Sequence, residues 1–173
     1  MAAALVLALP PASRADGKQE REKRMAEAVA VGRVESFVDA GGPSAELKMA
    51  DGTALAVPRD DQRFTYWAQK LAKDQASRAL VYVAYDSSSR HVTEVLPTAR
   101  QRVERVDADP AGDRLGVQLF MSPSKHYVLT TRPGHAERKA RLEAAAASKE
   151  ELLVTTDLTE LQILDARPLP PAN

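Results

Sequence analysis

The sequence predicts a mainly β protein with two helices, in which a unit of five strands and one helix occurs twice in tandem. Arg33-Val34-Glu35 recurs as Arg102-Val103-Glu104. A constant shift of 71 residues then pairs Val57 with Val128 and continues without a gap toward the end of the chain. The order of turn signals and apolar segments is also the same in both stretches, as expected for an internal duplication.

The first copy opens with three strands. An alternating apolar pattern predicts a strand at 29–38, and a Gly-Gly-Pro-Ser turn leads into a second strand at 45–49. Asp51-Gly52 is a strong hairpin signal, so the chain is expected to return as a third strand at 53–57.

A helix from about 61 to 78 follows, with Asp60 or Asp61 as its N-terminal cap. Phe64, Trp67 and Leu71 fall on one helical face, which predicts that Trp67 is a core residue. Two strands, at 80–85 and 91–96, close the unit.

The second copy repeats this order. Its expected strands are 101–106, 115–120, 125–130, 152–156 and 161–166, and its expected helix is 133–149. The helix carries His135 and Arg138 where the first copy has Phe64 and Trp67, so its inner face is thinner. We therefore expect the second unit to be the less stable one.

Five strands with a helix between the third and the fourth is the order of the OB-fold, a small Greek-key barrel. The resemblance covers most of residues 29–168 and concerns the topology alone. It does not indicate a function, because one fold can serve many functions. The fold class is therefore two OB-fold-like barrels, with SH3-like barrels or an open α+β sheet as alternatives. The units are placed at 29–98 and 99–168, with a short tail at 169–173.

The start of the chain resembles a secretory signal. Ala2 to Leu9 form an apolar run, two prolines end it, and Ser13-Arg14-Ala15 supplies small residues before a cleavage point. Residues 1–15 are therefore read as a signal peptide and 16–28 as a flexible charged lead-in. The protein is expected to be periplasmic or secreted, with no membrane-spanning segment after processing, because the run is far shorter than the roughly 20 residues a span needs.

Composition excludes several functional classes. There are 24 basic and 24 acidic residues, so no net field steers the chain toward polyanions, and the absence of cysteine excludes disulfides, thiolate metal sites and cysteine nucleophiles. Eight dispersed glycines form no phosphate-binding loop. No cofactor and no metal are expected.

The titratable residues do not form a recognisable site. His91, His126 and His135 lack the spacing of metal ligands and are read as structural. Asp60 and Asp61 are explained by helix capping.

Two further groups also favour structural roles. Asp107, Asp109 and Asp113 resemble a calcium loop, but Ala111 and Gln118 stand where that loop needs oxygen ligands. Among the aromatic residues Phe37, Tyr66, Trp67, Tyr82 and Tyr85, the two on the strand at 80–85 lie on opposite faces, so they cannot form one stacking platform. No residue is assigned to catalysis, to a cofactor or to a metal.

The function that we expect is non-catalytic binding or structural interaction with another periplasmic protein or a surface polymer, through a strand face, a sheet edge or the groove between the units. An OB-type nucleic-acid-binding protein is the first alternative. A hydrolase whose site is dispersed along the sequence is the second.

Overall fold

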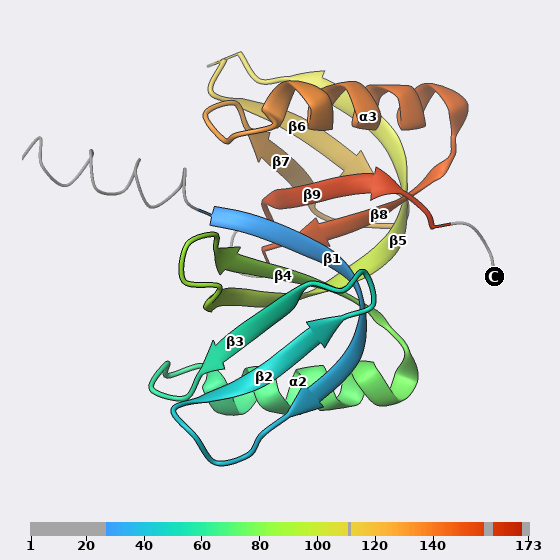
Figure 1. The fold of residues 1–173 in the computed structure, drawn as a ribbon. Coiled ribbons are helices and arrows are strands. Elements are labelled where there is room, and N and C mark those ends of the chain that lie inside the picture. The colour runs from blue at the N-terminus through green and yellow to red at the C-terminus, as the bar shows by residue number, and fades with distance from the viewer. Residues whose placement is uncertain (1–26, 111, 158–160, 171–173) are drawn as a thin grey trace, which may run out of the picture.

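The computed structural model describes residues 27–110, 112–157 and 161–170, which form a mainly β protein with two helices (Figure 1). The strands are β1 (Glu27–Val38), β2 (Ser44–Met49), β3 (Ala54–Pro58), β4 (Leu80–Asp86), β5 (Val92–Ala108), β6 (Arg114–Leu119), β7 (Lys125–Leu129), β8 (Glu151–Thr156) and β9 (Ile163–Pro168), and the helices are α2 (Phe64–Ser77) and α3 (His135–Ser148). The expected signal peptide, the lead-in up to residue 26 and the chain end at 171–173 lie outside the described residues. The lead-in was expected to reach residue 28, which is wrong, because Glu27 and Ala28 already pair with β4 as part of β1. No helix in the described part of the chain is long and apolar enough to cross a membrane.

All strand pairings are antiparallel and follow the order β3-β2-β1-β4-β5-β6-β7, with β8 pairing with β5 and β9. Strand β5 joins two halves of the molecule: it pairs with β4 before residue 98, with β8 over 98–102 and with β6 from 103 onward. The expectation of separate strands at 91–96 and 101–106 is therefore wrong. Pro97 stands between these segments, but it does not end the strand: Pro97 pairs with Val81 of β4, and Thr98 then pairs with Thr155 of β8.

We call residues 27–97 the first lobe and residues 98–168 the second lobe. In each lobe one long strand pairs first with one neighbouring strand and then with another. Strand β1 pairs with β4 up to Arg33 and then with β2, with an irregularity between Val34 and Ser36. Strand β5 shows the same change of partner in the second lobe, with its irregularity between Val103 and Arg105. An irregularity of this kind bends a strand and redirects its pairing.

The pairing registers of the two lobes also correspond. Val81 pairs with Pro97 as Leu152 pairs with Pro168, and each second-lobe residue lies 71 positions later. Near the strand irregularities the offset between equivalent residues of β1 and β5 is 69 instead, since Phe37 pairs with Leu47 as Val106 pairs with Val117.

The sheet is not closed by a continuous ladder in either lobe. In the first lobe the third strand approaches the last one through a single parallel bridge between Ala56 and His91. In the second lobe the equivalent bridge joins Tyr127 and Gln162. The Ala56 amide donates to the Arg90 carbonyl at 3.0 Å, and the Tyr127 amide donates to the Leu161 carbonyl at 3.3 Å.

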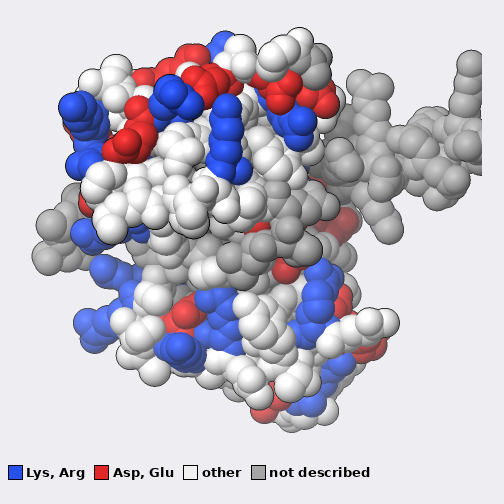
Figure 2. Space-filling view, turned by 180° about the vertical axis from the view of Figure 1, so that it is seen from behind, with Lys and Arg blue, Asp and Glu red and all other residues white. Residues whose placement is uncertain are grey.

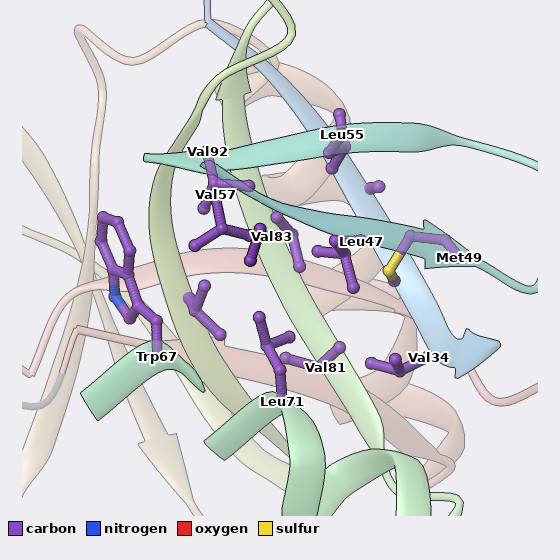
Figure 3. Close-up of a cluster of buried hydrophobic side chains, with 13 residues drawn as sticks. Val34, Leu47, Met49, Leu55, Val57, Trp67, Leu71, Val81, Val83 and Val92 are labelled. Carbon is purple, nitrogen blue, oxygen red and sulfur yellow. The ribbon is translucent and has the colours of Figure 1, made fainter. Parts of the chain in front are cut away.

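The first lobe has a core in which helix α2 covers the sheet. Trp67 and Leu71 project from α2 toward side chains of β3 and β4, including Val57 and Val83 (Figure 3). Both α2 side chains are fully buried, which confirms the prediction that Trp67 is a core residue. Full burial of a side chain of this size is worth several kcal/mol, so Trp67 is a principal source of stability in this lobe.

The second lobe has a smaller core without an aromatic member. Leu142 and Ala145 are the buried residues of α3, and they pack against buried residues of five strands, among them Val117, Val154 and Ile163. The expected thinner inner face of this helix is therefore present. A third cluster, formed by Tyr82, Ala84 and Leu164, packs the two lobes against one another.

Both helices begin later than expected. Arg63 precedes α2, and no side chain caps the helix. Asp61 instead forms a turn before it, since its carboxylate accepts from the Arg63 amide at 2.8 Å and its carbonyl accepts from the Phe64 amide at 3.0 Å. The prediction that Asp60 or Asp61 is the cap is therefore wrong. Helix α3 begins after Gly134, which has a φ of 71° that only glycine adopts without strain.

Candidate functional site

A groove at the junction of the two lobes is lined by residues of both lobes. Its wide part has a volume of about 450 Å³, and a narrower part of about 100 Å³ adjoins it. Glu27, Tyr82, Arg132 and Leu164 line both parts, so the two form one depression. The segments that line it come from the beginning of β1, the turns before both helices and the first turns of those helices, strands β4, β5 and β9, and the residue that follows β8. In Figure 1 the two helices lie at opposite outer ends of the molecule, with β1, β4, β8 and β9 between them.

The wide part is bordered by residues that are already engaged with one another. Arg63 forms ion pairs with Asp61 and Glu94, each at 3.0 Å. Its guanidinium also lies over the Trp67 ring, 4.4 Å from the ring centroid, so it covers the core residue from the groove side. Tyr66 is exposed beside it. This part therefore offers an aromatic ring and a fixed cation.

Tyr82 forms the floor of the groove. It is only 3% exposed, yet it lines both parts of the hollow. Burial raises the pKa of Tyr82 to about 12, and the nearby Glu27 carboxylate acts in the same direction. The phenol therefore stays protonated and can donate a hydrogen bond.

Two arginines of the second lobe border the narrow part. Arg138 is half-buried: its Nη2 donates to the Pro133 carbonyl at 2.9 Å, while its Nε is buried without a partner among the described residues. Burial lowers the pKa of Arg138, and the neighbouring charge of Arg132 lowers it further. The guanidinium groups of Arg132 and Arg138 thus lie close together and are partly shielded from solvent.

A second hollow, of about 280 Å³, lies on the strand face of the second lobe. It is lined by β6, β7 and the end of β5, with Arg114, Gly116, Lys125 and Tyr127 among its residues. Its two cations are compensated, because Arg114 pairs with Asp109 at 2.7 Å and Lys125 pairs with Asp107 at 3.1 Å. This face therefore has no excess of positive charge to attract a polyanion.

Charges of both signs are mixed over the molecule. On the face that Figure 2 shows, Lys and Arg side chains alternate with Asp and Glu side chains over both lobes. Ion pairs between neighbours account for much of this pattern, such as Lys48 with Glu35 and Arg114 with Asp109.

The three histidines are not brought together. His91 is exposed next to β3, His135 is the first residue of α3, and His126 is buried in the second lobe. Burial lowers the pKa of His126, and its Nδ1 has no partner among the described residues. The described residues contain no group of three or more potential metal ligands.

The aspartates and aromatics considered from the sequence serve local roles. Asp107 and Asp109 are ion-paired as described above, and Asp113 lies 3.9 Å from Arg114. The Arg63 side chain holds the pKa of Asp61 below its ordinary value. Tyr82 and Tyr85 lie on opposite faces of β4, since Tyr82 packs between the lobes and Tyr85 packs on the first core.

Sequence reasoning did not identify Glu27, Arg132 or Arg138 as site residues. Glu27 lies more than a hundred positions before the two arginines, and only the packing of the lobes places all three around Tyr82. One signal was present, because Arg138 replaces a core tryptophan in the comparison of the two copies.

No protein-family model matches the chain, and no curated protein matches it either.

Proposed function

We propose that this is an exported, non-catalytic binding protein that holds an extended segment of a surface polymer in the groove between its lobes. The observation that carries the proposal is Tyr82, a buried tyrosine that lines the hollow between two separately built cores. A groove that is concave and lined by aromatic and charged groups has the features of a binding site.

The chemistry of the groove favours binding over catalysis. The raised pKa of Tyr82 makes it a poor base near neutral pH, and Glu94 is paired with Arg63. The groove residues supply hydrogen-bond donors, one exposed ring and fixed charges. These groups orient a ligand and do not activate a nucleophile.

We further propose that the two lobes arose by tandem duplication of one OB-like unit, each a partly open barrel. Matching registers, matching strand irregularities and the equivalent parallel bridges support this origin. Barrels of this kind bind oligonucleotides and oligosaccharides. The paired charges on the second-lobe strand face favour a saccharide over a nucleic acid.

The groove can be tested with a single reporter, because the chain has no cysteine. Thr93→Cys places a thiol at the wide part of the groove, and an environment-sensitive dye is attached there. The labelled protein is titrated with polygalacturonate, neutral dextran, peptidoglycan fragments and a single-stranded oligothymidylate. We expect a saturable signal with at least one polysaccharide.

Ala54→Cys, on exposed β3 away from the groove, is the matched control and should give no signal. Equal responses at the two positions would show that the dye, rather than the groove, is responsible. A response to the oligothymidylate alone would favour the nucleic-acid alternative, and silence with the whole panel would reject the polymer-binding proposal.

Export has its own test. N-terminal sequencing of the protein from its native host is expected to give a mature start near Asp16. An intact Met1 would exclude cleavage and the periplasmic or secreted location.

A further inference from the structure

The narrow part of the groove differs from the wide part in the state of its arginines. Arg63, in the wide part, has two carboxylate partners. Neither Arg132 nor Arg138, in the narrow part, forms an ion pair with any described residue. Arg141, one helical turn after Arg138, is paired with Glu137, so α3 does have a carboxylate that another arginine uses.

The unpaired state is costly for Arg138 in particular. Its Nε is buried and makes no hydrogen bond with the described residues, and an unsatisfied buried donor costs free energy. A rotation of the side chain toward a ligand acceptor in the hollow would recover this cost. A second guanidinium nearby increases this cost through like-charge repulsion. An anion between the two would relieve both effects.

Tyr82 supplies a third donor at the same place. More than nine-tenths of this residue is buried, it lines the narrow part, and its hydroxyl has no hydrogen-bond partner in the described part of the chain. The hydroxyl oxygen is not one of the fully buried unpaired atoms, so it is the part of Tyr82 that stays open to the hollow, where an oxygen acceptor can accept its hydrogen bond.

We infer that the narrow part of the groove binds one singly charged oxyanion, a carboxylate or a sulfate ester, held by Arg132, Arg138 and the Tyr82 hydroxyl. Glu27 also lines this part and sets the preferred charge. Asp165 and Glu137 also act on Arg138, but they are ion-paired with Arg167 and Arg141. The remaining two arginines and one glutamate leave a net charge of about one positive unit, which a monoanion neutralises and a dianion exceeds. The inference rests on the proposed function, because it treats the groove as the ligand site and specifies an acidic polymer as the ligand.

The test uses four hexose probes that share one ring: glucuronate, a hexose sulfate, a hexose phosphate and neutral glucose. Arginine Nε–H resonances of the ¹⁵N-labelled protein are followed by NMR during each titration. We expect glucuronate and the hexose sulfate to shift the Arg138 resonance saturably, the phosphate to bind more weakly, and glucose to have no effect. Because this measurement uses the unaltered protein, it does not depend on any variant folding.

Variants then assign the donors. Arg138→Gln and Arg132→Gln should each weaken glucuronate binding by about tenfold or more, and Tyr82→Phe by a few-fold, as expected for charged and neutral hydrogen bonds. Lys139→Gln removes the same charge from the neighbouring helix position, which does not line the groove, and should leave binding unchanged. Circular dichroism confirms that each variant is folded.

Three outcomes would overturn the oxyanion site. The Arg138 resonance could shift equally with glucose and glucuronate, or it could fail to shift with glucuronate and with the hexose sulfate. Lys139→Gln and Arg138→Gln could also lose glucuronate affinity to the same extent. Each leaves the groove itself open to the Thr93 dye measurement. Conversely, a glucuronate response at Arg138 with no polymer response at Thr93 would support the oxyanion site and reject polymer binding along the whole groove.

Discussion

The helix of the first lobe buries an indole ring at the position where the helix of the second lobe carries a guanidinium. Trp67 is fully buried under Arg63, whereas Arg138 is half-buried and lines the groove. One helical turn later the two helices are alike, since Leu71 and Leu142 are both fully buried. The difference shows that Leu142 and Ala145, packed on the strands, suffice to hold such a helix on its sheet. The helix position four residues before the leucine, Trp67 or Arg138, can then serve either the core or a binding site.

The largest expected effect separates these two roles. Trp67→Ala should destabilise the protein by about 3–5 kcal/mol, since it leaves a large cavity among close-packed residues. Arg138→Ala should cost about 1 kcal/mol or less, because that side chain contributes little to a core. Urea denaturation followed by circular dichroism measures both. Comparable losses would mean that Arg138 is a structural residue and not part of a site.

The next effect concerns Tyr82, whose equivalent in the second lobe is Leu153. Its pKa is about 12 in the folded protein against an ordinary value of 10.0. The unfolded chain ionises first as the pH rises, so stability is complete below pH 10 and falls as the pH approaches 12. The loss should reach about 2–3 kcal/mol, because each unit of pKa difference corresponds to about 1.4 kcal/mol.

Tyr82→Phe should remove this alkaline decrease while leaving the lobes packed. The comparison needs denaturation curves of both proteins at neutral and alkaline pH. If the variant and the wild type lose stability in parallel as the pH rises, other groups cause the decrease and the pKa of Tyr82 is not raised by burial.

A smaller change in stability is expected at two equivalent inward-facing positions on the third strand of each lobe, Leu55 and His126. Leu55→His should cost about 1–3 kcal/mol, because it buries an imidazole in an apolar cluster. His126→Leu should stabilise the second lobe, since it removes an unsatisfied buried nitrogen.

The pH dependence of His126 has a definite sign. Its pKa is lowered by burial in the folded state, so the unfolded chain takes up the proton first as the pH falls below 6.5. The contribution of His126 to stability is therefore complete above that pH and is lost below it. His126→Leu should show a flatter acid limb in thermal melts, and an unchanged limb would rule out this assignment.

The smallest effect tests the hollow on the second-lobe strand face. Gly116 stands where the first lobe has Glu46, and a methyl group there would contact the end of the Lys125 side chain. Gly116→Ala should change stability by less than about 1 kcal/mol, since a flexible lysine can move aside.

A double-mutant cycle with Lys125→Ala measures this contact. Coupling of a few tenths of a kcal/mol is expected, because the lysine leaves its Asp107 partner when it moves. A severe loss in Gly116→Ala that persists without the lysine would point to a backbone constraint instead.

Local patterns in the sequence were sufficient for most elements of the fold. The alternating strand at the start of the first lobe, the Asp51-Gly52 turn and the face shared by Trp67 and Leu71 each follow from short-range chemistry. The continuous strand β5 was missed, because alternation at 91–96 and 101–106 does not indicate whether the chain pauses between them. Its partners on three other strands decide that.

The groove could not be predicted in the same way. Glu27, Tyr82, Arg132 and Arg138 have no common spacing, and each belongs to a different element or turn. By itself, the sequence determined the two sets of strands and helices and the burial of Trp67, because periodicity and turn chemistry act over a few residues. Only the tertiary structure decided that Tyr82 lies beside two arginines that have no ion-pair partner among the described residues, because burial and electrostatic neighbours depend on how the lobes pack across Leu164.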